Sequence, residues 1–272
     1  MSLPFSDHCE PLLSDTNELP DFVAWLCRDS DLRALKYFEL RLLPRHEIPD
    51  RLLVPSHSYC FHTLDLKRPL EVIFGRMHKD SIQRRIRRAS REQLYCEVGR
   101  SRDLVHDFYR LLIMTRDRHH VPPQPLAWFR NLIECMGEKV QISVARKSNV
   151  SIAAMLTLRH GAKVVYKYGC SDAQYHHLGG MPFLFWKLIE ASKRSGATEI
   201  DFGRAELDHQ GLITFKDRFG TSRKQLTYFR YPQAEKRAGM WSWSAQTLGR
   251  VLAVLPTYVM PSIGRVMYRH IG

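Results

Sequence analysis

At 272 residues, of which 44% are hydrophobic, the chain can form one large domain or two small ones with a substantial core. Its 41 lysines and arginines outnumber 28 aspartates and glutamates, and the net charge of +13 indicates an anionic partner such as a nucleic acid, a phosphate-bearing substrate or an anionic membrane surface. The six cysteines are dispersed without a CxxC pair, which argues against a disulfide framework and a zinc module, so we assign no metal.

The N-terminal segment MSLPFSDHCEPLLSD carries early acids and no basic region followed by an apolar run, so we expect no signal peptide. No stretch near 20 residues is continuously apolar, so we expect no membrane-spanning helix. These features predict a cytoplasmic protein, and a peripheral contact with the inner membrane stays open.

The first predicted elements are two helices between proline-rich turns, a strand and a third helix. Their expected ranges are Pro20–Arg28, Asp31–Leu43, Ser58–Leu66 and Leu70–Lys79.

The next segment, RMHKDSIQRRIRRASREQL (Arg76–Leu94), combines an apolar stripe with a basic surface. Ser81 is placed to cap a helix, in which Ile82, Ile86 and Ala89 recur at helical spacing. The basic positions are Arg84, Arg85, Arg87, Arg88 and Arg91. Because an arginine fork grips two phosphate oxygens at once, we expect this helix to bind the phosphates of an acceptor, or an RNA backbone. A solvated basic face is the alternative.

The remaining chain is predicted to alternate helices and strands in an α+β half-domain. Helices are expected over Ser101–His119 and Leu126–Met136, on either side of the break VPPQP. Three consecutive strands are expected at Lys139–Arg146, Ile152–Arg159 and Lys163–Cys170. After the loop SDAQYHHLGG come a helix over Met181–Ser195, the strand TEIDFG, a short helix and the strand LTYFRYP.

Four segments between about Thr63 and Pro232 together resemble the FemAB-like branch of the GNAT acyltransferases. They are SIQRRIRRASRE, FYRLLIMTRDRHHVPPQPLAWFRNL, VVYKYGCSDAQYHHLGGMPFLFWKLIEAS and IDFGRAELDHQGLITFKDRFG. The resemblance implies an α+β fold with a GNAT-like mixed, mainly antiparallel sheet flanked by helices. It also implies a shortened N-terminal half with the basic helix (1–100), a complete C-terminal acyltransferase half (101–232) and a basic amphipathic tail (233–272).

The activity implied by the resemblance is N-acyl transfer from an activated donor, with acyl-CoA favoured, to an amine on a sugar, peptide or lipid-linked envelope precursor, as in polysaccharide biosynthesis. Two alternatives stay open. One is an aminoacyl-tRNA-dependent peptidyl transferase, which the absence of a helical-arm insertion disfavours. The other is a non-catalytic protein that binds a membrane or a nucleic acid.

The corner IDFGRAELDHQGLITFKDRFG supplies the candidate catalytic residues. Lys216, beside Phe215, is suited to stabilising a developing oxyanion or holding a donor phosphate, and the resemblance puts this pair at the donor end of the cleft. The alternative is a solvated lysine beside a core phenylalanine. Asp201 is expected to line the cleft and, with Arg204, to orient the substrate; a structural ion pair is the alternative.

The loop before the Met181 helix supplies the other candidates. His177, Gly179 and Gly180 lie near a helix N-terminus, where backbone amides attract a donor phosphate, or form a plain exposed loop. Tyr168 is expected to line the cleft, although strand alternation puts it on the same sheet face as Tyr166, where packing alone would explain both. The tail, with Trp241 and Trp243, either contacts a membrane surface or packs on the domain.

Overall fold

The computed structural model describes residues 5–29, 37–44, 53–231 and 260–268. In this part of the chain the strands form one eight-stranded sheet with the order β1-β8-β2-β7-β6-β5-β4-β3. The strands are β1 (Phe38–Leu40), β2 (Val54–Asp65), β3 (Tyr95–Gly99), β4 (Val140–Lys147), β5 (Val150–His160), β6 (Lys163–Ser171), β7 (Glu199–Glu206) and β8 (Ser222–Tyr231). The pairs β1–β8, β3–β4, β4–β5 and β5–β6 are antiparallel, whereas β6 and β7 are parallel. The predicted α+β class, with a mixed and mainly antiparallel sheet, is confirmed.

The helices of the described ranges precede, connect and follow these strands. They are α1 (Leu19–Arg28), α3 (Leu70–Arg76), α4 (Arg84–Arg91), α5 (Arg102–Arg118), α6 (Leu126–Met136), α7 (Gly180–Arg194), α8 (Gln210–Asp217) and α10 (Met260–Met267). A π-helical turn, Lys79–Gln83, leads into α4, and a 3-10 helix, Ala173–Leu178, leads into α7.

The chain divides into two compact units, each built from segments that are distant in the sequence. The first unit comprises Met1–Phe61, Arg204–Ile213 and Arg223–Ser244. The second comprises His62–Gly203, Thr214–Ser222 and Ala245–Gly272.

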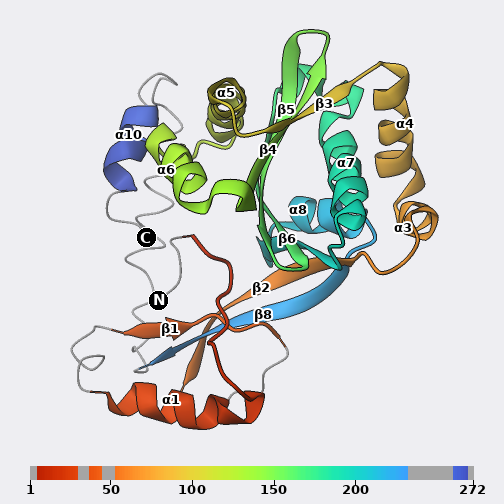
Figure 1. Cartoon of the computed structure of the whole chain (residues 1–272). Helices are drawn as coiled ribbons and strands as arrows, with labels where there is room; N and C mark the ends of the chain where they lie inside the picture. Colours follow the sequence, from red (N-terminus) through yellow and green to blue (C-terminus); the bar gives the residue numbers. More distant parts are fainter. Residues whose placement is uncertain (1–4, 30–36, 45–52, 232–259, 269–272) are drawn as a thin grey trace. The chain divides into compact units, whose positions relative to one another are not determined.

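In the second unit, helices cover both faces of the sheet (Figure 1). One face carries α5 and α6, whose buried side chains, such as Phe108 and Phe129, pack with Tyr168. The other face carries α3, α4 and α7, around an aromatic cluster that includes Phe185, Phe202 and Phe219. Both helical layers follow from apolar positions at helical spacing, which bury one side of each helix against the strands.

In the first unit, α1 buries Leu19, Val23 and Cys27 among residues that include Leu42 and Leu53. A separate cluster joins β2 to β8 through residues that include Tyr59 and Tyr228, whose ring centroids are 4.8 Å apart.

Two expectations for the N-terminal half are wrong. The expected helix over Asp31–Leu43 is contradicted where the structure describes it, because Phe38–Leu40 forms β1 and pairs with β8; pairing across the sheet outweighs local helix preference there. Ser81 does not cap the basic helix. It lies inside the π-helical turn, whose cap is His78, with the Nδ1 atom accepting from the Ser81 N–H at 3.3 Å. The short strand β3 was not expected.

The helix α10 and Tyr268, which follows it, pack against the proline-rich segment between α5 and α6. The Tyr268 hydroxyl donates to the Pro122 carbonyl at 3.2 Å, and a Cβ at Gly264 would overlap the carbonyl oxygen of Pro123. A glycine is therefore needed for this close approach of α10. The tail positions that carry Trp241 and Trp243 lie outside the described residues. In the described ranges no helix combines the length and apolar character needed to cross a bilayer.

Candidate functional site

The parallel strands β6 and β7 pair only through the first three residues of each strand. Their register joins Lys163 to Glu199, Val164 to Ile200 and Val165 to Asp201. Beyond that point β6 continues to Ser171 and β7 to Glu206, with no further register pair between them in this fully described stretch. The register pairing of β6 with β7 therefore ends at Val165, and a strand side without such pairing is where a ligand can bond as an added strand.

A bulge in β6 decides which tyrosine lies on which face. The β5–β6 register joins Leu156 to Tyr168 but Thr157 to Tyr166, so Lys167 is an extra residue. Because one inserted residue reverses the alternation, Tyr166 packs with the α7 face and Tyr168 with the α5–α6 face. The expectation that the two tyrosines share a face is wrong for this reason.

Tyr166 is the first residue of β6 beyond its pairing with β7. Its ring packs on Phe185, with centroids 4.6 Å apart, and its hydroxyl lies over Gly169, where a Cβ would overlap it. Burial raises the pKa of Tyr166 well above its ordinary value. Among the described residues no side chain or backbone group is found hydrogen-bonded to this hydroxyl. The sequence did not single out Tyr166 over Tyr168, because the bulge has no sequence signal.

Tyr168 lies in the core of the opposite face. Its hydroxyl accepts a hydrogen bond from Trp128 Nε1 at 3.2 Å, and its ring contacts Phe129 edge-on at 5.2 Å. With 7% of its surface exposed, it has the environment of a packing residue.

Two buried charged side chains converge on one glycine at the end of β7. Asp201 Oδ1 accepts from the Gly203 N–H at 2.6 Å, and Lys216 Nζ donates to the Gly203 carbonyl at 2.9 Å. Gly203 has a φ of +72°, which only glycine adopts without strain. Lys216 is 3% exposed, so it is not a solvated lysine, and Phe215 beside it packs on Phe219 at 5.2 Å.

The structure also brings together a pair that the sequence did not suggest. His62 of β2 is fully buried, and its Nε2 lies 3.1 Å from Asp217 Oδ1, next to Lys216 on α8. The side chain of Asp217 is 41% exposed. The two residues are 155 positions apart in the chain, and no spacing rule links them.

At the N-terminus of α7 the two predicted phosphate-binding glycines serve packing. A Cβ at Gly179, where φ is +78°, would lie 2.8 Å from the Arg85 carbonyl oxygen, and one at Gly180 would lie 3.0 Å from Ala153 Cβ. These glycines therefore let α4 and β5 approach α7 closely. His177 is exposed, with its Nδ1 2.9 Å from the Gln174 carbonyl oxygen.

The neighbouring His176 belongs to a positively charged cluster at this helix end. Its Nε2 is hydrogen-bonded to Ser171 Oγ at 2.8 Å. Burial, followed by the charges of Arg118 and Arg85, lowers the pKa of His176 below its ordinary value. Arg118 also donates to the Ser171 carbonyl at 3.3 Å. A helix N-terminus with two nearby guanidinium groups suits an anion.

The other arginines predicted to bind phosphate are Arg84, Arg87 and Arg88. They are exposed on α4, and their contacts differ from those of Arg85. Arg84 pairs with Asp80 at 3.6 Å, and Arg88 pairs with Glu92 at 3.9 Å. The guanidinium of Arg87 lies 5.5 Å from the centroid of a phenylalanine ring on α3.

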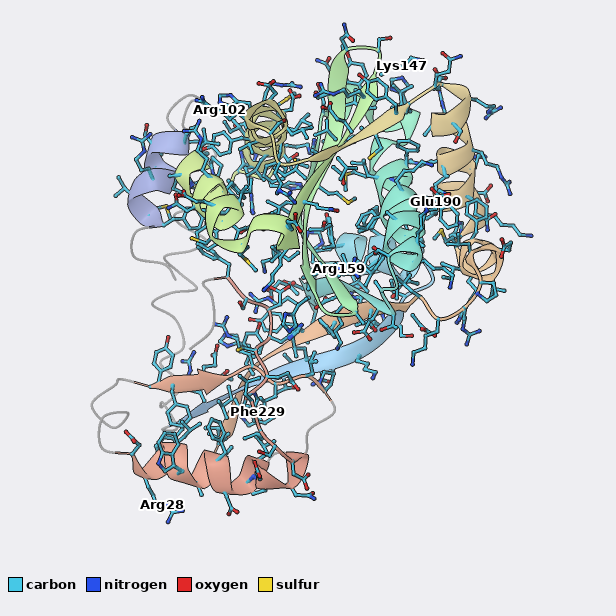
Figure 2. The ribbon with its side chains drawn as sticks, viewed as in Figure 1. Arg28, Arg102, Lys147, Arg159, Glu190 and Phe229 are labelled. Atoms are coloured by element: carbon cyan, nitrogen blue, oxygen red, sulfur yellow. The ribbon has the colours of Figure 1, made fainter. Side chains whose placement is uncertain are left out.

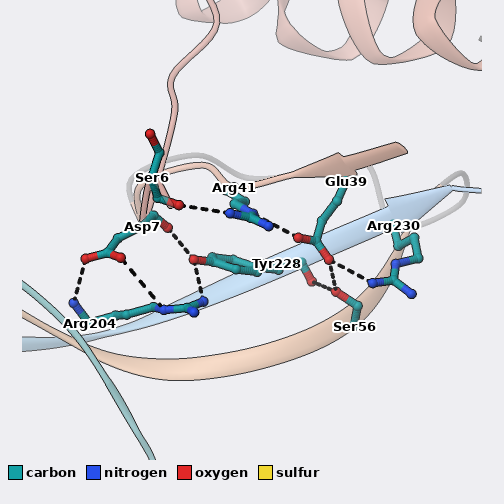
Figure 3. Close-up of polar contacts among 8 residues, drawn as sticks. All are labelled: Ser6, Asp7, Glu39, Arg41, Ser56, Arg204, Tyr228 and Arg230. Atoms are coloured by element: carbon teal, nitrogen blue, oxygen red, sulfur yellow. Dashed lines mark hydrogen bonds and ion pairs between the residues drawn. The ribbon is translucent and has the colours of Figure 1, made fainter. Parts of the chain in front are cut away.

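Arg204 lies in a polar network of the first unit (Figure 3). Its guanidinium lies 4.0 Å from the Tyr59 ring centroid and donates to the Tyr228 hydroxyl at 2.7 Å. The Tyr228 hydroxyl in turn donates to the Asp7 carbonyl, and Asp7 Oδ1 lies 3.9 Å from Arg204 Nε. The partners that hold Arg204 here come from β2, β8 and the N-terminal segment. In the described part of the chain no group of three or more His, Cys, Asp or Glu side chains could hold a metal ion.

Comparisons with known proteins agree with this fold. Residues 76–211, half of the chain, match the family model described as "Acetyltransferase (GNAT) domain". The crystal structure of FemX superposes with a TM-score of 0.58 at 14% identity, covering 74% of this chain and 67% of that one. The C-terminal domain of a putative lysylphosphatidylglycerol synthetase from Agrobacterium fabrum gives 0.59 at 16% identity, covering 86% of this chain and 79% of that one.

Identities this low establish a shared fold alone. A search of the curated proteins found no match. The match to the family model, over half of the sequence, carries the assignment, and the resemblance expected from the four sequence segments is confirmed. The chain belongs to the GNAT acetyltransferase family and is an acyltransferase.

Proposed function

We propose that the protein transfers an acyl group from acyl-CoA to an amine on a sugar, peptide or lipid-linked envelope precursor. The observation that carries the proposal is the early end of the β6–β7 pairing, with the Tyr166 hydroxyl at its start. An amide-bearing donor can hydrogen-bond to the second half of β6 as an added strand.

The charge at the end of β6 supports a donor that also carries phosphates. Beyond Ser171 the chain reaches the N-terminus of α7, where Arg85 and Arg118 influence His176. A molecule that extends along β6 would present its amides to the strand and its phosphates to this helix end. Acyl-CoA contains both kinds of group, and GNAT domains generally use it.

The reaction requires the amine nitrogen to bond to the thioester carbonyl carbon while the carbon–sulfur bond breaks. The departing thiolate then takes a proton, and the ammonium formed at the acceptor loses one to solvent, so that no net proton is gained or lost. Tyr166 is the proposed donor of the first proton, because its hydroxyl lies where the β6–β7 pairing ends and a tyrosine hydroxyl is protonated at neutral pH.

Asp201, Lys216 and Gly203 are proposed to act together as positioning residues. They hold the end of β7 in the conformation in which it leaves β6, through two hydrogen bonds to the same glycine. Phe215 packs within the aromatic cluster beneath this corner and supports it.

The proposal is tested by mixing the purified protein with acyl-CoAs and amine acceptors and measuring release of free CoA. Gly169→Val should abolish release, because its side chain would displace the Tyr166 hydroxyl. Gly75→Ala is the matched control, since a Cβ at Gly75 meets no atom within 4 Å. Unchanged release in Gly169→Val, or no release from any acyl-CoA, would contradict the proposal.

A further inference from the structure

A concentration of positive charge lies on and beside α3 and α4, and the proposed acyl transfer uses only Arg85 of it. We call this the basic face. Its nine cations are Lys67, Arg68, Arg76, Lys79, Arg84, Arg85, Arg87, Arg88 and Arg91, and all are exposed. Only two acids, Glu71 and Asp80, occur between positions 67 and 91, so this short stretch has a net charge of +7 out of the chain's +13.

Neighbouring acids compensate little of this charge. In the described residues the ion pairs of the basic face are Arg68–Asp65, Arg84–Asp80 and Arg88–Glu92, at distances of 3.6 to 3.9 Å. Exposed pairs of this length contribute at most about 1 kcal/mol each to stability. Within the described part of the chain six of these cations have no such pair, and their mutual repulsion is relieved when an anionic surface approaches.

Apolar side chains interrupt the basic face. Val72 of α3 is 42% exposed, and the partly buried Phe74 contacts Trp186 of α7 edge-on at 4.9 Å. Arginines beside partly exposed aliphatic and aromatic side chains are typical of surfaces that lie at the boundary between lipid headgroups and acyl chains. This chemistry matches a lipid surface in two ways, by charge and by apolar contact.

The aromatic arrangement favours lipid over nucleic acid. Bases of a single strand stack on open aromatic faces. The ring of Phe74 is covered by the Arg87 guanidinium at 5.5 Å, and Trp186 lies against it. The basic face therefore offers phosphate contacts but a poor platform for bases.

We propose that the basic face binds the protein to an anionic membrane surface. The helices α3 and α4 would lie on the headgroups, with their arginines on lipid phosphates and Val72 at the apolar boundary. Figure 2 shows the side chains of α4 projecting outward, on the side of the sheet away from Arg102 of α5. The proposal does not depend on the acyl donor, because Arg85 is the one cation shared with the proposed donor site and vesicle binding is a different measurement.

Sedimentation with lipid vesicles tests it directly. The full-length protein should bind vesicles of phosphatidylcholine with phosphatidylglycerol and should not bind vesicles of phosphatidylcholine alone. Raising the salt concentration should weaken binding, because exposed charges are screened. Equal binding to both kinds of vesicle, or to neither, would overturn the proposal.

Charge variants locate the surface. The combination Arg84→Gln, Arg88→Gln and Arg91→Gln should weaken binding on the order of 100-fold, since each cation near an anionic surface contributes about fivefold. The matched control removes the same charge from exposed positions on the α5–α6 side through Arg102→Gln, Arg130→Gln and Lys139→Gln. It should retain binding within about threefold. An equal loss in both triple variants would show that net charge alone acts, and would refute the assignment.

Two further measurements separate lipid from other anions. Replacing Arg84, Arg88 and Arg91 by lysine should preserve vesicle binding, because a headgroup surface requires charge rather than the arginine fork. Loss of binding in this lysine variant would indicate a specific phosphate site and contradict the proposal. Binding of tRNA through the same three arginines, without binding of anionic vesicles, would identify a nucleic-acid surface instead.

Discussion

Replacement of Lys216 by methionine separates a positioning role from a reacting one. In the structure the Lys216 ammonium is buried and donates to the Gly203 carbonyl at 2.9 Å, while Asp201 accepts from the N–H of the same glycine. Methionine fills a similar volume but cannot donate. The variant therefore loses a buried, charge-assisted hydrogen bond and leaves a buried carbonyl without this donor.

The expected cost is about 1.5–3 kcal/mol, the range for hydrogen bonds that involve a charged group. For a domain of this size each kcal/mol lowers the melting temperature by about 2–4 °C, so Lys216→Met should melt about 3–12 °C lower. Differential scanning fluorimetry measures the shift. Lys163→Met is the matched control, because Lys163 is 52% exposed and pairs with Glu199 at 3.2 Å; its melting temperature should fall by less than about 4 °C.

A double-variant cycle with Asp201→Asn sharpens the test. Since both side chains hold Gly203, the two substitutions should be non-additive by about 0.5–3 kcal/mol. An unchanged melting temperature in Lys216→Met together with abolished turnover would refute this reasoning, because it would mean that the ammonium acts on the substrate and not on the corner.

Three other substitutions have defined outcomes. Tyr168→Phe should cost about 0.5–1.5 kcal/mol of stability, because the hydrogen bond from Trp128 is lost, and should leave CoA release intact. A loss of CoA release would indicate instead that Tyr168 lines the cleft. Burial raises the pKa of Glu39, but hydrogen bonds and charges from Arg41 and Arg230 lower it overall below its ordinary value. Its contribution is therefore present above its unfolded-state pKa and lost as pH falls through the lower folded value, so Glu39→Gln should flatten the acid-unfolding curve, and an identical curve would contradict this. Gly264→Val should release α10 from the Pro123 carbonyl, seen as faster proteolysis of the C-terminal helix, and unchanged cleavage would count against that contact.

The sequence predicts the second half of the fold well because its patterns are local. The period-two strands and the intervening helices occur close to the expected ranges, and the apolar stripe of Ile82, Ile86 and Ala89 is buried as expected. Predictions were wrong where a distant partner decides the structure. Strand β1 exists because it pairs with β8, about 190 residues later, and no local pattern contains that information.

The candidate site could be predicted from the sequence only in part. The corner of Asp201, Gly203 and Lys216 could be found because its residues are close in sequence. Tyr166 could not be distinguished from Tyr168, since a single extra residue in β6 reverses the faces of the strand.

The central claim is that the second half of β6 holds the acyl donor and that Tyr166 protonates the departing thiolate. The most direct measurement compares CoA release and acyl-CoA binding in the wild type and in Tyr166→Phe, which removes only the hydroxyl. We predict that kcat falls by about 10²–10⁴, as for a lost general acid, while the Kd for acyl-CoA changes less than about threefold. A variant that releases CoA at the wild-type rate would contradict the account.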